Sequence, residues 1–142
     1  MTTTAGARGH RLAPHTADIV IEAWGGSVDA CLEEAATALV TSCADVRGAG
    51  WARTAEVELT GSDEQVLVDL LEEIIYRLDT DHGIPVRIRV RRRGRAVQVA
   101  MWLTDRHRVE VTGPAPKGVA YSQLSLAEEA PGHWRCRVTV DV

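Results

Sequence analysis

The second half of the chain, from residue 84 to residue 142, consists of strand patterns. Apolar and polar residues alternate along it with the period of two that half-buried strands show. The segments that we predict to be strands are 86–92, 96–103, 108–112, 119–127 and 134–142. So many consecutive strands, joined by short connections, favour antiparallel pairing within a sheet.

Residues 19–24 form an earlier strand pattern that ends at a Gly-Gly turn and leads into a helix. Ser27 stands where the N-cap of a helix belongs. From Val28 to Cys43, apolar residues recur at helical spacing. We therefore predict an amphipathic helix that begins after Ser27 and ends near Ala44.

A second pair of elements follows, a strand over 55–60 and a helix with a broad apolar stripe. Ser62 and Gln65 have the spacing of a capping box at the start of this helix. The stripe runs from Val66 to Leu78 at helical spacing. Two helices and a following run of strands predict an α+β fold, in which the two helices pack on one face of a mostly antiparallel β-sheet.

Length and composition are those of a single globular domain. The chain has 142 residues, of which 45% are hydrophobic and 25% are charged. Residues 1–9 are small and polar and are predicted to form a disordered tail, which leaves residues 10–142 as one domain. The sequence shows neither a secretory h-region nor an apolar run of about 20 residues, so we expect a cytoplasmic protein without a membrane partner. The three cysteines have no C-x-x-C spacing and are expected to be reduced.

Arginines are concentrated on the predicted hairpin around Gly94. The alternation that begins at Val86 puts Arg87, Arg89 and Arg91 on one face of a strand. Such a row is either the solvated outer face of an antiparallel sheet or a patch that binds RNA phosphates. The net charge of −4 argues weakly against a dedicated nucleic-acid binder, and aromatic residues do not interleave with these arginines.

Acidic side chains stand at two strand ends that are far apart in the sequence. Asp18 opens the strand pattern of residues 19–24, with His15 three residues before it. The final strand pattern persists to Asp141, next to the terminal carboxylate of Val142. Ordered carboxylates suit hard cations such as Ca²⁺, Mg²⁺ and Mn²⁺, but an exposed aspartate at a strand end needs no ligand. His15 is equally compatible with a role beside Asp18 and with a solvated loop.

Motifs for nucleophilic catalysis and for nucleotide binding are missing from the sequence. It contains no G-x-S-x-G, no P-loop and no G-x-G-x-x-G, and its five histidines are scattered. We therefore do not expect an enzyme, and a metal-dependent hydrolase is the weakest alternative. Lys117 is the only lysine among 16 basic residues, which reflects either chance or a site that requires a compact ammonium group.

Four segments of the sequence together resemble the archease family. They are His15–Ile19 with the strand and helix that follow, Leu70–Asp79, Lys117–Tyr121 and Val140–Val142. The match in order and spacing covers nearly the whole chain, from about His10 onwards. The resemblance implies a small α+β sandwich.

The resemblance also implies an accessory protein rather than an enzyme. Such a protein would activate the GTP-dependent RNA ligase of tRNA splicing and RNA repair, promoting guanylylation of the ligase and its multiple turnover. The alternative function is that of an RNA-processing chaperone, which would bind tRNA or a tRNA-modifying enzyme through the hairpin of Arg87–Arg95.

The family's metal site and its lysine carry over to this sequence residue by residue. The implied metal ligands are Asp18, Asp141 and the carboxylate of Val142. Ca²⁺ is the expected ion, with Mg²⁺ and Mn²⁺ as alternatives. Lys117 and His15 are expected to contact the partner or a nucleotide. If Asp18 and the Asp141–Val142 end lie too far apart to share one ion, this metal site is excluded.

Overall fold

The computed structural model describes residues 6–13, 18–80 and 83–142. These residues form two α-helices, one 3₁₀ turn and nine strands. In chain order the elements are β1 Gly9–Ala13, β2 Asp18–Gly25, α1 Val28–Thr41, β3 Ala44–Asp45, β4 Arg53–Thr60, α2 Asp63–Asp79, β5 Ile84–Arg93, β6 Ala96–Thr104, η1 Arg106–Arg108, β7 Glu110–Val111, β8 Gly118–Ala130 and β9 His133–Asp141. Neither helix in these ranges is long and apolar enough to cross a membrane.

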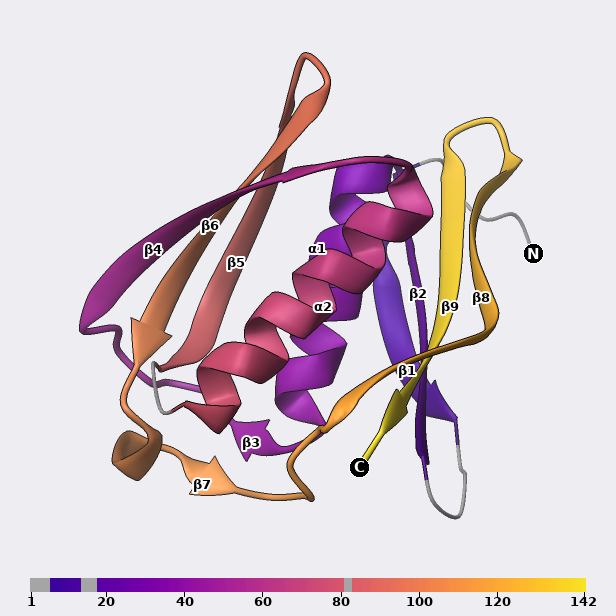
Figure 1. Ribbon diagram of the computed structural model, residues 1–142. Coiled ribbons are helices and arrows are strands. Elements are labelled where there is room, and N and C mark those ends of the chain that lie inside the picture. The colour runs from indigo at the N-terminus through magenta and orange to yellow at the C-terminus, as the bar shows by residue number, and fades with distance from the viewer. Residues whose placement is uncertain (1–5, 14–17, 81–82) are drawn as a thin grey trace.

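Two larger sheets lie on either side of the helices. Their strand orders are β1-β2-β9-β8 and β4-β6-β5, while β3 and β7 form a small third sheet. Every strand pair among the described residues is antiparallel. Helix α1 contacts β2 of one large sheet and β5 of the other, and α2 contacts β8 and β4, so both helices lie between the sheets (Figure 1). The predicted α+β fold, two helices with a mostly antiparallel sheet, is confirmed, and its strands are divided between the two sides of the helix layer.

Helix α1 begins as its N-cap pattern predicts. The side chain of Ser27 accepts a hydrogen bond from the backbone N–H of Ala30 at 3.1 Å. The buried residues of α1 are mostly small or aliphatic: Cys31, Leu32, Ala35, Ala36, Ala38, Leu39 and Val40. They surround much of the helix because both sheets pack against it. The helix ends at Thr41, slightly before the predicted end near Ala44.

Helix α2 carries the apolar stripe that its sequence predicts. Its buried residues are Val66, Leu67, Val68, Leu70, Leu71, Ile74 and Ile75. Ser62 accepts a hydrogen bond from the backbone N–H of Gln65 at 3.1 Å. The Gln65 side chain donates to Asp69 at 2.8 Å instead of reaching back, so the reciprocal half of the predicted capping box is not formed. A glutamine and an aspartate four residues apart are neighbours on a helix surface, which explains the competing bond.

Strand β1 is an element that the sequence pattern does not predict. It pairs with β2 over its whole length. Arg8, just before β1, forms ion pairs with Glu33 and Glu34 of α1. Residues 8 and 9 therefore belong to the fold, in contrast to the disordered tail predicted for residues 1–9, of which residues 1–5 lie outside the described ranges. Partners elsewhere in the chain hold this short strand, and its own sequence carries little strand signal.

The segment 108–112, predicted as a strand, is a strand only at Glu110–Val111. A 3₁₀ turn precedes it, in which the backbone N–H of Arg108 donates to the carbonyl oxygen of Asp105 at 3.0 Å. The short strand β7 then pairs with β3, which follows α1. Figure 1 shows this small sheet at the end of the molecule where both helices also end.

Candidate metal centre at the ends of three strands

Asp18 and Asp141 lie directly opposite each other. Asp18 is the first residue of β2, Asp141 is the last residue of β9, and the antiparallel register pairs the two. Directly opposed residues point to the same face of a sheet, with Cβ atoms about 4.5–5.5 Å apart. Asp18 is half-buried and Asp141 is exposed. Asp18 and the Asp141 end are thus not too far apart to share one ion, while metal binding itself stays a prediction.

The apolar face of the sheet explains why these acids meet. Ile21 of β2 is paired with Val138 of β9, and both are fully buried against the helices. Because side chains alternate along a strand, Asp18 and Asp141 turn to the outer face. A slip of one residue would move every apolar side chain of the strand to solvent, so core burial keeps the two acids in register.

The opposed carboxylates favour a cation between them. Like charges directly opposite each other destabilise a strand pair, and a divalent ion would convert this repulsion into attraction. Carboxylate oxygens are the donors that Ca²⁺, Mg²⁺ and Mn²⁺ prefer. Within the described ranges, no group of three or more His, Cys, Asp or Glu side chains is arranged to hold an ion. The two aspartates would therefore leave most coordination positions open.

Lys117 lies beside the aspartate pair. Its backbone N–H donates to the carbonyl oxygen of Asp141 at 2.7 Å, and the next residue, Gly118, pairs with Asp141 in the β8–β9 register. The Lys117 side chain is exposed. The structure thus brings the three predicted residues Asp18, Asp141 and Lys117 to one end of the four-stranded sheet, with Val142 next in the chain. His15, the other predicted contact, lies outside the described residues.

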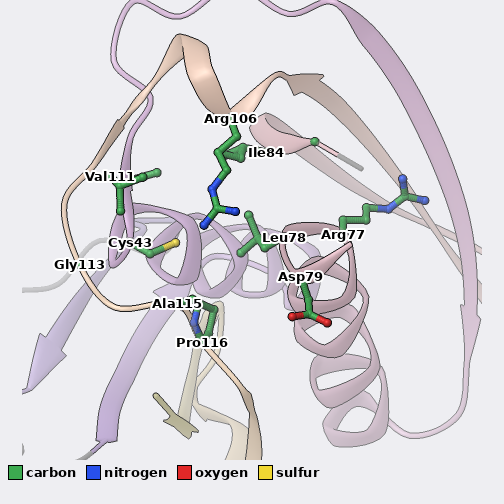
Figure 2. Close-up of a pocket in the computed structure, with 12 residues that line it drawn as sticks. Cys43, Arg77, Leu78, Asp79, Ile84, Arg106, Val111, Gly113, Ala115 and Pro116 are labelled. Atoms are coloured by element: carbon green, nitrogen blue, oxygen red, sulfur yellow. The ribbon is translucent and has the colours of Figure 1, made fainter. Parts of the chain in front are cut away.

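A cavity of about 140 Å³ opens next to this end of the sheet. It is lined by the loop that leads to Lys117 and by residues at the ends of both helices. Figure 2 shows the guanidinium group of Arg106 reaching into the space between Cys43 and Leu78. A cation near the C-terminal ends of helices complements their dipoles, which accounts for Arg106 at this position. Burial raises the pKa of the Cys43 thiol, so this cysteine stays protonated and is a poor nucleophile.

The sequence matches the model of the Archease protein family (MTH1598/TM1083) over residues 10–142. The chain belongs to the archease family. It is similar to the probable protein archease of Mycobacterium tuberculosis (strain ATCC 25618 / H37Rv), with 40% identity over 135 residues that cover 94% of this chain and 75% of the relative. It is also similar to the protein archease of Methanosarcina mazei, with 32% identity over 136 residues that cover 90% of this chain and 92% of the relative.

Solved structures share the archease fold seen here. The solution structure of Methanobacterium thermoautotrophicum protein 1598 has a TM-score of 0.76 and 21% identity, covering 94% of this chain and 99% of that chain. The crystal structure of an archease from Thermotoga maritima, described as a possible chaperone, has a TM-score of 0.69 and 22% identity, covering 100% and 98%. At these identities the comparison shows the α+β architecture alone.

The predicted RNA contacts Arg87, Arg89 and Arg91 lie in a different part of this archease fold. They are exposed on the outer face of β5, an edge strand of the three-stranded sheet. Arg87 is paired with Trp102 of β6, and its guanidinium carbon lies 4.8 Å from the centre of the Trp102 ring. Trp102 is therefore an aromatic neighbour that the sequence did not reveal. Figure 1 shows the turn between β5 and β6 at the opposite end of the molecule from the C-terminus.

A cluster of three arginines around Glu22 was not anticipated from the sequence. Arg11, Arg135 and Arg137 all donate to the carboxylate of Glu22 on the outer face of the four-stranded sheet. The strand alternation predicts only that Arg135 and Arg137 point away from the core. Their common partner comes from β2, more than a hundred residues earlier, which explains why local pattern missed the cluster.

Gly113 lets the loop before Lys117 pack against the end of α1. A Cβ atom added at Gly113 would lie 2.2 Å from the backbone carbonyl oxygen of Ser42. The backbone of Ser42 cannot move away from the added Cβ atom as a flexible side chain could. We therefore expect Gly113→Ala to lower the free energy of unfolding by about 1–3 kcal/mol. Urea unfolding measures the loss, with Gly50→Ala as the control, since nothing lies within 4 Å of a Cβ there. Equal stability of the two variants would contradict this close packing.

Proposed function

We propose that this chain is a cytoplasmic accessory protein, rather than an enzyme, that activates a GTP-dependent RNA ligase of tRNA splicing and RNA repair. It promotes guanylylation of the ligase and its multiple turnover through a bound divalent ion. The ligands of the ion are Asp18, Asp141 and the carboxylate of Val142. The direct pairing of Asp18 with Asp141 across β2 and β9 carries this proposal.

The donor set fits an ion that is shared with a partner. The aspartates supply hard oxygen donors and leave coordination positions open for other groups. In nucleotide sites, Mg²⁺ is usually held by one or two carboxylates together with the substrate phosphates. Ca²⁺ is the ion that we name first, and Mg²⁺ and Mn²⁺ are alternatives with the same preference for oxygen. A site of this kind leaves room for the phosphates of the nucleotide that guanylylates the ligase.

Lys117 supplies a positive charge at the same end of the sheet. Its side chain is exposed, and its backbone is bonded to Asp141. A compact ammonium group pairs with a phosphate or a carboxylate as a point charge, without the bidentate geometry of arginine. We therefore assign Lys117 to contact with the nucleotide or with an acidic group of the ligase. The same role is proposed for His15, which lies outside the described residues.

The test is a guanylylation and multiple-turnover ligation assay with the cognate ligase, with and without this protein. A protein extended by one glycine after Val142 moves the α-carboxylate and changes no side chain. We expect the extension to remove ion binding, measured by calorimetry, and to remove the stimulation of the ligase. Val142→Ala is the matched control, because it keeps the α-carboxylate in place. Equal stimulation by the extended protein and the control would exclude the terminal carboxylate as a ligand.

A second candidate function is RNA binding by the arginine row of β5, as in an RNA-processing chaperone for tRNA or a tRNA-modifying enzyme. The observation that favours it is the exposure of Arg87, Arg89 and Arg91 on one face of an edge strand. Binding of this kind weakens steeply with salt because phosphate contacts release counterions. Salt-dependent tRNA binding that disappears when these three arginines are neutralised would support this function over the first.

A further inference from the structure

On the outer face of the four-stranded sheet, three arginines gather around one carboxylate. Glu22, which is only 7% exposed, accepts hydrogen bonds from three arginines on two neighbouring strands. Arg137 Nη1 lies 2.7 Å from Glu22 Oε1, Arg135 Nη2 lies 3.2 Å from Oε2, and Arg11 Nε donates to Oε2 as well. We call Arg11, Arg135 and Arg137, with Glu22, the Glu22 cluster.

The register of the strands explains why one carboxylate accepts hydrogen bonds from three arginines. Glu22 of β2 is directly opposite Arg11 of β1 on one side and Arg137 of β9 on the other. Arg135 is two residues along β9 and therefore points to the same face. Arg135 also approaches the exposed Glu129, with 3.7 Å between Nε and Oε1. The Glu22 cluster itself carries a net charge of +2. The contact between Arg135 and Glu129 offsets part of this charge.

Contacts around the Glu22 cluster hold the guanidinium groups in place. The hydrogen bond from Arg11, together with the nearby charges of the other two arginines, lowers the pKa of Glu22, so the carboxylate stays ionised. The guanidinium carbon of Arg135 lies 5.3 Å from the centre of the Trp24 ring. That ring lies against Gly9 of β1, where an added Cβ atom would be 2.6 Å from it. The arginines are thus ordered before any ligand binds, which reduces the entropy lost on binding.

The remaining N–H groups of these arginines are available to a ligand. The side chains of Arg11, Arg135 and Arg137 are 64%, 42% and 40% exposed, in that order. Each guanidinium has five N–H donors in a planar fork, and the bonds to Glu22 use only some of them. The planar guanidinium group matches the geometry of phosphate oxygens and can donate two hydrogen bonds to them. Exposed, ordered donors with excess positive charge therefore attract a polyanion.

We propose that the Glu22 cluster binds the phosphate backbone of single-stranded RNA. The cluster lies on the same face of the sheet as Asp18, four residues before Glu22 on β2, which corresponds to about 13 Å along the strand. An extended strand of RNA can follow β2 and β9 from the arginines toward the aspartate pair. The choice of RNA rests on the proposed role in RNA processing.

The Glu22 cluster suits an RNA backbone better than the arginine row of β5 does. Arg89 and Arg91 extend from an edge strand as exposed side chains, so a ligand would have to order them on binding. In the Glu22 cluster, the carboxylate has already fixed the positions of the arginines. The acidic surface of a protein partner also matches guanidinium forks, and the experiment separates it from RNA.

The experiment measures binding of a fluorescent single-stranded RNA by anisotropy, in the absence of ligase, over a range of salt concentrations. The test variant is Arg11→Gln combined with Arg137→Gln. The control is Arg89→Gln combined with Arg91→Gln, which removes the same charge from the other large sheet. We expect the test variant to lose about 10- to 30-fold in affinity at 0.1 M salt, and the slope of log K against log[salt] to fall by about 1.4. The control should keep the affinity and the slope of the wild type.

Several outcomes would overturn the proposal. If the test variant keeps its RNA affinity but is less stable in urea, the Glu22 cluster only stabilises the sheet. An equal loss in test and control variants means unspecific charge attraction, and a loss in the control alone assigns RNA to the β5 row. If the test variant keeps its RNA affinity but no longer binds the ligase in a separate binding measurement, the partner of the Glu22 cluster is an acidic protein surface instead.

Two further variants keep the result interpretable. Arg11→Lys combined with Arg137→Lys retains the charge and tests the geometry of the forks, and we expect it to recover part of the affinity. Asp18→Ala should bind RNA without ligase at least as tightly as the wild type, because it removes a negative charge and no arginine of the Glu22 cluster. RNA binding can thus be lost while the aspartate pair still supports guanylylation of the ligase. Guanylylation can equally be lost while RNA binding remains, so the two proposals are tested separately.

Discussion

Alanine in place of Asp18 or Asp141 is expected to abolish the stimulation of ligase guanylylation. Each replacement removes one of two carboxylates that lie directly opposite each other at the end of the sheet. Loss of an outer-shell partner typically lowers metal affinity 10- to 100-fold, so loss of a ligand is expected to lower it at least about 100-fold. The measurements are the rate of guanylylation with each variant present and calorimetric titration of the variant with Ca²⁺, Mg²⁺ or Mn²⁺.

Stability measurements separate loss of the ion from loss of the fold. Without an ion, the Asp141→Ala variant should be at least as stable as the wild type, because the repulsion between opposed carboxylates is gone. With an ion at about 100 times its Kd, the wild type should gain about 2.7 kcal/mol and the variants should gain little. Thr139→Ala, on the same face two residues from Asp141, is the control. If the alanine variants keep both the stimulation of the ligase and the ion-dependent gain in the free energy of unfolding, the metal-site proposal is wrong.

Leu71→Ala is expected to lower the free energy of unfolding by about 2–5 kcal/mol. Leu71 is fully buried in α2, which packs against strands of both large sheets. Strands on both sides limit how far the structure can collapse into the space that is left, so the cost belongs in the upper part of this range. Urea unfolding followed by circular dichroism measures the difference.

Glu64→Ala is the matched control for the Leu71 variant. Glu64 lies on the same helix but is exposed, so its replacement should change the free energy of unfolding by at most about 0.5 kcal/mol. If Leu71→Ala costs less than about 1 kcal/mol, α2 is not packed between two sheets as described.

Local periodicity was enough to locate most of the fold. The helical spacing of apolar residues in α1 and α2, and their serine caps, are signals contained within a few turns of chain. The same holds for the alternation of β9, whose Cys136, Val138 and Val140 are buried in the core, and of β4, whose inward-facing residues are partly buried against it. β1 was missed because its order depends on pairing with β2 and on the ion pairs of Arg8 with α1.

The candidate sites were predictable only in part, for the same reason. The alternation of the last strand determines that Arg135, Arg137 and Asp141 leave the core on one face, whatever the strand is paired with. Which residues stand opposite them is decided by tertiary structure. The Glu22 cluster assembles from three strands, and Asp18 meets Asp141 across β2 and β9.

The sequence by itself thus determined most of the elements, the faces of their strands and the acids at two strand ends. The tertiary structure decided that these ends meet and that Lys117 stands beside them. The physical reason is that the alternation within a strand is a local property of the backbone, whereas register follows from burying the apolar faces of distant strands together. With Ile21 and Val138 buried opposite each other, Asp18 can only face Asp141.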